Sequence, residues 1–284
     1  MTLLNKTHRV PMTSLEMNVA YGCNLQCEYC THLGRFMKGI VPLDDLLLWY
    51  RSWNQKIRPQ TIRIMGGEPL LHPHLESVLY ETRSHWQDSR IEVMSNGLLL
   101  PKIKTSVFTA VKETESHMTL SRHYDDPYYN PILEAGIDLL RTHGIEPRVA
   151  QSHQSWMKCY RIDERGHARP YQSDPTKAWK ICYVKHICTT LIDNCLYRCP
   201  QLGCSAYAVK KGFVHFDDWK VVLGYQPLMP DCTQEELEAF MKEGVCEQCS
   251  ICPGEFQHAN QYEKINPFGL PVIRNLFCGD PNHE

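Results

Sequence analysis

The sequence predicts an α/β fold with a parallel sheet, followed by a small cysteine-rich region. In the first half, β-rich runs alternate with helical stripes, and successive runs start near residues 61, 91, 117 and 145. This repeat of roughly 26–30 residues is the size of a βα unit, and consecutive units imply parallel strands. After about residue 165 the repeat stops, in a polar, turn-rich segment. We therefore expect two domains, residues 1–165 and 166–284.

Strands are expected where β-rich runs end at turn residues. The run TIRIM stops at Gly66-Gly67, and the run IEVMS stops at Asn96-Gly97. The run SLEMNVA alternates in polarity and leads straight into a cysteine loop. The expected strands are residues 14–20, 61–65, 91–95, 117–121 and 145–151, with a sixth around 156–162.

Helices are expected where apolar residues recur at helical spacing between start and stop signals. Residues 43–53 carry such a stripe, with two acidic residues in the first turn. Another helical pattern follows His74. Residues 131–143 begin with a proline, which suits a first helical turn, and end at Gly144. Residues 234–243 follow Thr233, which is spaced from Glu236 as a capping box.

The composition is that of an ordinary soluble globular protein except for cysteine. The 284 residues carry a net charge of −2, so no basic excess indicates nucleic-acid binding. The first residues have no apolar core of a signal peptide, and no stretch is apolar for the roughly 18 residues of a membrane span. We therefore expect a cytoplasmic protein. In the reducing cytosol its 14 cysteines are better explained by metal ligation than by disulfides.

Three of these cysteines form a compact loop directly after the first strand. Cys23, Cys27 and Cys30 have the spacing C-x3-C-x2-C, and Tyr29 precedes the last of them. Three thiolates are one fewer than the four that a cubane iron–sulfur cluster usually takes, so one iron is left open for a reacting ligand. A structural zinc site is the alternative, and it would need a fourth ligand from elsewhere.

A second motif, Gly66-Gly67-Glu68-Pro69, ends the second strand. Glycines allow close backbone approach, and the carboxylate of Glu68 can meet an ammonium group. Together, the two motifs resemble those of the radical S-adenosylmethionine (radical SAM) superfamily. The resemblance implies an open partial (β/α)6 TIM-like barrel, a 4Fe–4S cluster on the three cysteines and S-adenosylmethionine bound to the open iron. It also implies an external one-electron donor of flavodoxin or ferredoxin type.

In this superfamily the reduced cluster cleaves S-adenosylmethionine to a 5′-deoxyadenosyl radical, which removes a hydrogen atom from the substrate. Softer matches to the family's cofactor contacts follow at the ends of later strands. The resemblance assigns cofactor contacts to Tyr29, to Gly66, Gly67, Glu68 and Pro69, to Ser95 and Asn96, to Ser121, and to Gln151 or Ser152. His123 and Tyr124 are candidate substrate contacts. For each of the softer matches, a capped strand end is the plain alternative.

Ten further cysteines lie at residues 182–278. A cysteine, a hairpin with Asn194 at its turn and a distant C-x2-C resemble the SPASM/twitch auxiliary-cluster domain, in its smaller form with one 4Fe–4S cluster. The expected ligands are Cys182, Cys199, Cys246 and Cys249, with Cys252 and Cys188 as replacements. A zinc knuckle on residues 246–252 is the alternative. Among the remaining cysteines, Cys159, Cys195, Cys204, Cys232 and Cys278, Cys204 or Cys159 is a candidate hydrogen donor.

Fold and cofactor do not identify the substrate. Only about 22 residues precede Cys23, too few for the N-terminal leader-binding module of many peptide-maturing relatives, although a partner protein could supply it. The compact architecture is similar to that of small dehydrogenases and epimerases of sugars and aminocyclitols. The first hypothesis is therefore an oxidoreductase or epimerase that dehydrogenates or epimerises a carbohydrate-like small molecule. The second is a maturase that modifies a ribosomally made peptide. The third is a non-catalytic iron or zinc binding module. No membrane or nucleic-acid partner is expected.

Overall fold

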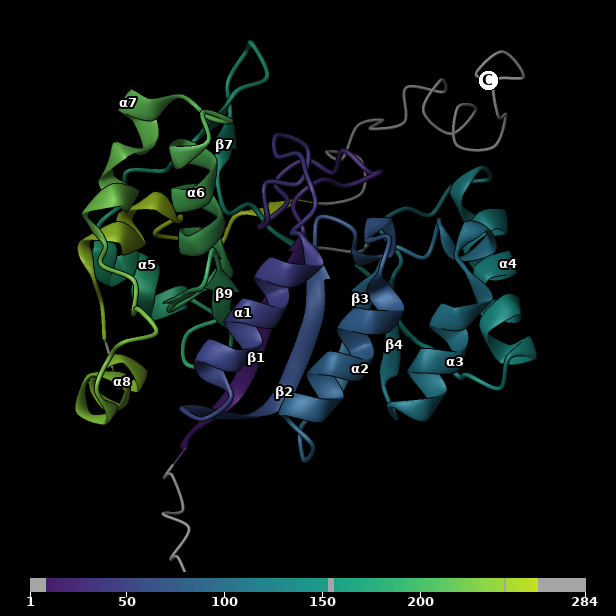
Figure 1. Cartoon of the computed structure of the whole chain (residues 1–284). Helices are drawn as coiled ribbons and strands as arrows, with labels where there is room; N and C mark the ends of the chain where they lie inside the picture. The colour runs from purple at the N-terminus through teal and green to yellow at the C-terminus, as the bar shows by residue number, and fades with distance from the viewer. Residues whose placement is uncertain (1–8, 153–155, 243, 260–284) are drawn as a thin grey trace, which may run out of the picture.

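A seven-stranded sheet in the order β10-β9-β1-β2-β3-β4-β5 forms the centre of the protein (Figure 1). It is described from a computed structural model that covers residues 9–152, 156–242 and 244–259. Five strands follow one another in the chain and in the sheet, and each neighbouring pair is parallel. They are β1 (Val10–Ala20), β2 (Ile57–Gly66), β3 (Arg90–Ser95), β4 (His117–Ser121) and β5 (Arg148–Ala150). The predicted α/β class and the partial-barrel arrangement of parallel strands are confirmed.

The sixth parallel strand is not at residues 156–162, so this expectation was wrong. Those residues hold β6 (Trp156–Met157) and β7 (Arg161–Ile162). They pair outside the main sheet, with β11 (His258–Ala259) and β8 (Ala168–Arg169). Only a short segment separates β5 from β6, whereas a crossover to a parallel neighbour needs about a dozen residues or more.

The sixth parallel strand is instead β9 (Thr189–Ile192), which pairs with β1 on the other side of β1 from β2. It turns back into the antiparallel β10 (Cys195–Tyr197). The turn residues Asp193 and Asn194 have φ angles of 54° and 58°, as a two-residue hairpin turn requires. The main sheet thus contains strands from both sides of residue 165, and the division into two domains there remains a prediction.

The expected helices are present, and two long ones were not expected. α4 begins two residues before Pro131 because the Asp126 carboxylate accepts the N–H groups of Tyr128 and Tyr129, both at 2.8 Å. α8 carries the predicted capping box of Thr233 and Glu236. α3 and α6 were missed. The helices are α1 (Leu43–Trp53), α2 (Leu75–His85), α3 (Thr105–Glu113), α4 (Tyr129–Thr142), α5 (Pro175–Ile181), α6 (Pro200–Lys210), α7 (Phe216–Trp219) and α8 (Gln234–Met241).

The two faces of β1 have different chemistry. Leu15, Met17 and Val19 are fully buried in the hydrophobic core, together with side chains of α1 and α2. Figure 1 shows α1, α2 and α3 on the same side of the sheet. On the alternate positions, β1 carries polar residues, and α6 packs against this second face: the Asn18 amide donates to Cys204 Sγ at 3.7 Å. We call this second face, which α6 covers, the inner face. No helix within the described ranges has the length and apolar character to cross a membrane.

Candidate cofactor and metal site

A cavity of about 240 Å³ opens at the carboxyl ends of the parallel strands. This is the edge where active sites of α/β proteins form. Cys23, Cys27 and Cys30 all line it, on the loop that follows β1. The other lining residues are Leu25, Tyr29, Thr31, His32, Gly34, Arg35, Met65, Gly66, Gly67, Glu68, Met94, Ser95, Asn96, Ser121, His123, Ser152 and Trp156. The two predicted motifs therefore meet in one cavity.

The glycine pair allows this meeting because the cysteine loop crosses directly over it. The N–H of Gly67 donates to the Ala20 carbonyl at 2.8 Å, and the N–H of Glu68 donates to the Gly22 carbonyl at 3.0 Å. A Cβ on Gly67 would stand 2.1 Å from that Gly22 oxygen, and one on Gly66 would stand 1.9 Å from the Ala20 oxygen. The glycines thus admit the approach of the chain's own backbone, rather than only the approach of a ligand.

Glu68 is a buried carboxylate with three donors. Its side chain is 1% exposed and accepts hydrogen bonds from Ser95 Oγ at 2.7 Å, Asn96 N at 2.9 Å and Leu70 N at 3.0 Å. Burial raises the pKa of Glu68 to about 7, although these donors oppose the rise. A cation bound beside it would favour the charged form. The carboxylate is therefore suited to an ammonium group.

The cysteine loop lies among polar neighbours. Burial raises the pKa of Cys30, but the adjacent His32 more than offsets this, so the pKa of Cys30 lies below its usual value. Burial lowers the pKa of His32, yet its contacts with Cys30 and Glu16 raise the pKa to about 10. A histidinium beside Cys30 favours the thiolate that binds iron. His32 was missed from the sequence, although its place two residues after Cys30 was a usable signal.

The remaining predicted contacts divide into those inside the cavity and those outside it. Ser95, Asn96, Ser121, His123, Tyr29 and Ser152 line it. Pro69 begins a short helix over Pro69–Leu71, and Gln151 is exposed; neither lines the cavity. Tyr124 is buried instead, where its hydroxyl donates to Cys27 Sγ at 3.3 Å. Of the alternatives Gln151 and Ser152, the geometry favours Ser152, and Tyr124 is placed as a neighbour of a cysteine rather than of a substrate.

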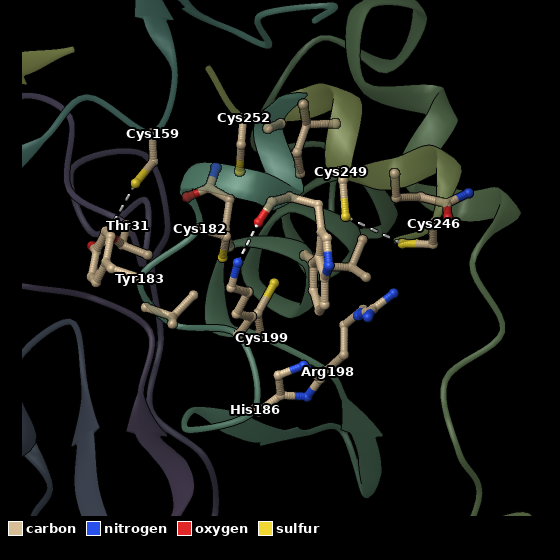
Figure 2. A pocket seen from close by; sticks show the side chains of 18 of the residues that line it. Thr31, Cys159, Cys182, Tyr183, His186, Arg198, Cys199, Cys246, Cys249 and Cys252 are labelled. Atoms are coloured by element: carbon tan, nitrogen blue, oxygen red, sulfur yellow. Dashed lines mark hydrogen bonds between the residues drawn. The ribbon is translucent and has the colours of Figure 1, made fainter. Parts of the chain in front are cut away.

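A second cavity, shown in Figure 2, gathers six cysteines. The four expected ligands line it, together with Cys252, one of the two replacements, and Cys159. Figure 2 shows their side chains around one space between α5, α6 and the segment at 246–252. Cys188, Cys195, Cys204 and Cys232 do not line it, and Cys278 lies outside the described residues. The structure thus brings together cysteines that are up to 93 positions apart, from Cys159 to Cys252 (252 minus 159).

The cysteines of each cavity are spread around its walls. Within the described residues, no three Cys, His, Asp or Glu side chains are arranged to hold a single metal ion. The sulfurs of Cys246 and Cys249 lie 3.7 Å apart.

The residues of the first cavity fit an iron–sulfur cluster with one open position and a ligand bearing an ammonium group. Three soft thiol donors line it, a buried carboxylate faces the same space, and no fourth cysteine among the described residues lines this cavity. Thr31, which follows Cys30, lines both cavities.

Comparison with known proteins identifies the first part of the chain. Residues 17–146 match the model of the Radical SAM superfamily. This region is a radical SAM domain, as the two motifs predicted, and its cofactors are a 4Fe–4S cluster and S-adenosylmethionine.

Curated relatives match only a part of the chain. GTP 3′,8-cyclase of Staphylococcus saprophyticus is 31% identical over 111 residues, which are 35% of this chain and 32% of that protein. GTP 3′,8-cyclase of Clostridium acetobutylicum is 32% identical over 95 residues, 31% of this chain and 29% of that protein. The matching part thus spans about a third of these relatives.

Solved structures overlap loosely with the chain. BtrN in complex with AdoMet and 2-DOIA is 13% identical, covers 75% of this chain and 86% of its own, and has a TM-score of 0.44. SuiB of Streptococcus suis bound to its precursor peptide SuiA is 19% identical, covers 53% of this chain and 36% of its own, and has a TM-score of 0.39. At these scores the overlap identifies no activity.

Proposed function

We propose that this protein is a radical SAM enzyme that removes a hydrogen atom from a carbohydrate-like small molecule and thereby dehydrogenates or epimerises it. The observation that carries the proposal is the polar inner face of the sheet beside the cofactor cavity. A barrel interior that packs only for stability is filled by branched apolar side chains. In this protein, the inward-facing side chains of β1, β2 and β3 include a row of charged residues.

The charged row lies one inward-facing position below the cofactor cavity. Met65 and Met94 line that cavity, and two residues earlier on the same strands stand Arg63 and Glu92. The register aligns Arg63 with both Glu92 and Glu16. The Arg63 guanidinium lies 3.6 Å from the Glu92 carboxylate and 3.9 Å from the Glu16 carboxylate. These charges are paired with one another, but a buried ion pair adds little stability over apolar packing, so we take the row to be a lining suited to a polar ligand.

Unpartnered polar atoms lie on β1 and α6. Asn18 Oδ1 and Ser205 Oγ are buried without a hydrogen-bond partner, and Asn18 contacts Cys204, the neighbour of Ser205 on α6. Both amide atoms of Gln201 are also unpartnered, but Gln201 lines the second cavity. Buried polar groups normally have partners, so Asn18 and Ser205 are suited to the hydroxyl groups of a bound substrate. The relatives named for a reaction of GTP also act on a small molecule that contains a sugar.

Each group in the first cavity then has a role. Cys23, Cys27 and Cys30 hold the cluster, and Glu68 binds the amino group of S-adenosylmethionine. When bound, these cofactors supply a radical that abstracts hydrogen from an unactivated carbon. The chain's own residues orient the two partners and exclude water, as proteins do for cofactors that carry the difficult chemistry.

A thiol near the substrate would complete an epimerisation by returning a hydrogen atom. Cys204 is fully buried on the inner face beside Asn18, and burial raises its pKa well above the usual value, so it stays a neutral S–H group. Cys159 is also a buried thiol, but it lines the second cavity, with its sulfur 3.5 Å from Thr31 Oγ1. Cys204 is the better placed of the two for a substrate on the inner face.

The second cavity would hold an auxiliary 4Fe–4S cluster on Cys182, Cys199, Cys246 and Cys249, as in the twitch form of the auxiliary domain. Its six thiols exceed the four that such a cluster takes, and five of them lie within one enclosed region of α5, α6 and residues 246–252. Cys252, which lines the same cavity, remains the replacement ligand.

The test begins with anaerobically reconstituted protein, reductant and S-adenosylmethionine. Formation of 5′-deoxyadenosine is expected for the wild-type chain and should be lost in Cys30→Ala, while Cys195→Ala, a cysteine outside both cavities, serves as the control. Normal 5′-deoxyadenosine formation by Cys30→Ala would refute the assignment of the cluster ligands.

Substrate class is tested by a panel of deuterated sugars and aminocyclitols in parallel with candidate precursor peptides. Transfer of deuterium from a sugar carbon into 5′-deoxyadenosine is the expected result. A product lighter by two hydrogens indicates dehydrogenation, and a product that gains solvent deuterium at an inverted centre indicates epimerisation. A mass change confined to the peptides would replace this proposal with the maturase hypothesis. No 5′-deoxyadenosine under any condition would favour a non-catalytic binding module.

A further inference from the structure

Arg198 is fixed against the second cavity by three contacts. It follows β10 and directly precedes Cys199. Its guanidinium carbon lies 4.8 Å from the centre of the Trp179 ring, and its Nη2 donates to the Gly244 carbonyl. The guanidinium also interacts with the Cys246 thiol. Figure 2 shows the side chain below Cys246 and Cys249. These contacts hold a permanent positive charge beside two expected cluster ligands.

The whole second cavity has a positive lining. Lys185 and His186 line it together with Arg198, whereas no Asp or Glu is found among its described lining residues. Lys185 Nζ is anchored on the Trp179 carbonyl at 3.0 Å and lies 5.5 Å from the centre of the same ring. The first cavity differs, since the Glu68 carboxylate lines it alongside His32 and Arg35. Among the described lining residues, only the first cavity thus places an acidic group beside its basic ones.

We propose that Arg198 is a positioning residue that favours one-electron reduction of an iron–sulfur group held in the second cavity. Cluster potentials depend on net charge and on hydrogen bonds to the sulfurs, and a nearby cation stabilises the state with the extra electron. This inference rests on the proposed auxiliary cluster.

The consequence for the reaction is a preference for dehydrogenation. A secondary alcohol carbon that has lost one hydrogen atom becomes a ketone by losing one further electron and its hydroxyl proton. An iron–sulfur group held in the second cavity would accept this electron, and water would accept the proton, so the substrate would lose two hydrogens in total. Epimerisation needs a returned hydrogen atom and no such acceptor. A positive cavity therefore points to oxidation of the carbohydrate-like substrate.

The experiment measures the reduction potential of each cluster by redox titration with electron paramagnetic resonance. Arg198→Gln is compared with Arg198→Lys and with Arg161→Gln as a matched control. Arg161 has the same two kinds of contact, with its guanidinium 5.9 Å from the centre of the Tyr171 ring and Nη2 3.0 Å from the Pro170 carbonyl, but it does not line the second cavity.

Arg198→Gln is expected to lower the equilibrium constant for reduction of the second cluster at least tenfold, which is about 59 mV toward negative potential for one electron. The first cluster and the Arg161→Gln protein should keep the wild-type potentials. Arg198→Lys keeps the positive charge but loses the planar guanidinium, so it should shift the potential of the second cluster by less. If Arg198→Gln binds no iron, the potential measured in Arg198→Lys tests the inference.

Three results would overturn the inference: an unchanged second potential in both Arg198 variants, a wild-type protein without a second cluster signal, or an equal shift in Arg161→Gln. Failure of the proposed function is separate. In that case the potentials shift as expected, but no sugar of the panel transfers deuterium.

Discussion

Gly67→Ala is expected to separate the cysteine loop from the end of β2. The added Cβ would stand 2.1 Å from the Gly22 oxygen and 2.4 Å from the Gly22 carbonyl carbon. Because the obstacle is backbone, no side chain can rotate away, and overpacking of this kind costs about 1–3 kcal/mol. If the strands part to relieve the clash, the bonds from Gly67 N and Glu68 N are weakened, at about 1 kcal/mol each. The expected loss is about 3–5 kcal/mol.

The assay is urea unfolding followed by tryptophan fluorescence, together with iron content and binding of S-adenosylmethionine. Gly22→Ala is the matched control, since a Cβ there has no neighbour nearer than 3.6 Å and should be tolerated. If the backbone contact governs the site, Gly67→Ala loses stability, iron and cofactor binding while Gly22→Ala keeps all three. A Gly67→Ala protein with wild-type stability and iron content would refute the reasoning.

Three further predictions concern other parts of the chain. Cys246→Ala should lower the iron content of the reconstituted protein by about four atoms per chain, while Cys232→Ala leaves it unchanged; equal iron in both would reject the ligand set. Glu68→Gln should flatten the pH dependence of stability between pH about 4.5 and 7. The raised folded pKa of about 7 makes Glu68 stabilise at low pH and lose that contribution as pH rises, and a slope as steep as that of the wild type would contradict this. Thr233→Ala removes the cap of α8 and should cost about 1 kcal/mol in unfolding experiments; a cost above about 2 would indicate another role.

The parallel sheet could be predicted because its strands carry local signals. The β-rich run at 91–95 ends at Asn96-Gly97 and a further β-rich run covers 117–121, and the structure places β3 and β4 there within one residue. The same holds for the loop of Cys23 to Cys30, because its ligands are close in sequence. The strand pattern and the cysteine spacing can each be recognised within a short stretch of sequence.

The inner helix α6 could not be predicted in this way. Nine of its eleven residues are buried, including Gln201, Cys204 and Ser205, so it shows no apolar stripe of helical period. Its neighbour β9 was read as one arm of a hairpin, but its pairing with β1 depends on residues more than 170 positions apart (189 minus 15). Long-range pairing of this kind leaves no mark in the local pattern.

The role of Arg198 was hidden for the same reason. In the sequence it is an arginine beside a cysteine, which is a common arrangement. Only the folded chain brings Trp179, Gly244 and Cys246 around it. Residues that act on a site from a second layer are therefore the part of this protein that sequence patterns describe least.

The alternation along β1 has a consequence for how this enzyme could change over time. Leu15, Met17 and Val19 belong to the hydrophobic core, whereas Ser14, Glu16 and Asn18 lie on the inner face, where Glu16 pairs with Arg63 and Asn18 contacts α6. Substitutions at the first set are expected to alter folding, and under the proposed function substitutions at the second set would alter which substrate is bound. A lineage could therefore explore new substrates by exchanging alternate residues of one strand, while the intervening residues keep the scaffold intact. In a mutational scan of residues 14–19, substitutions at odd-numbered positions would lower the stability of the fold, and substitutions at even-numbered positions would change the selectivity for the substrate.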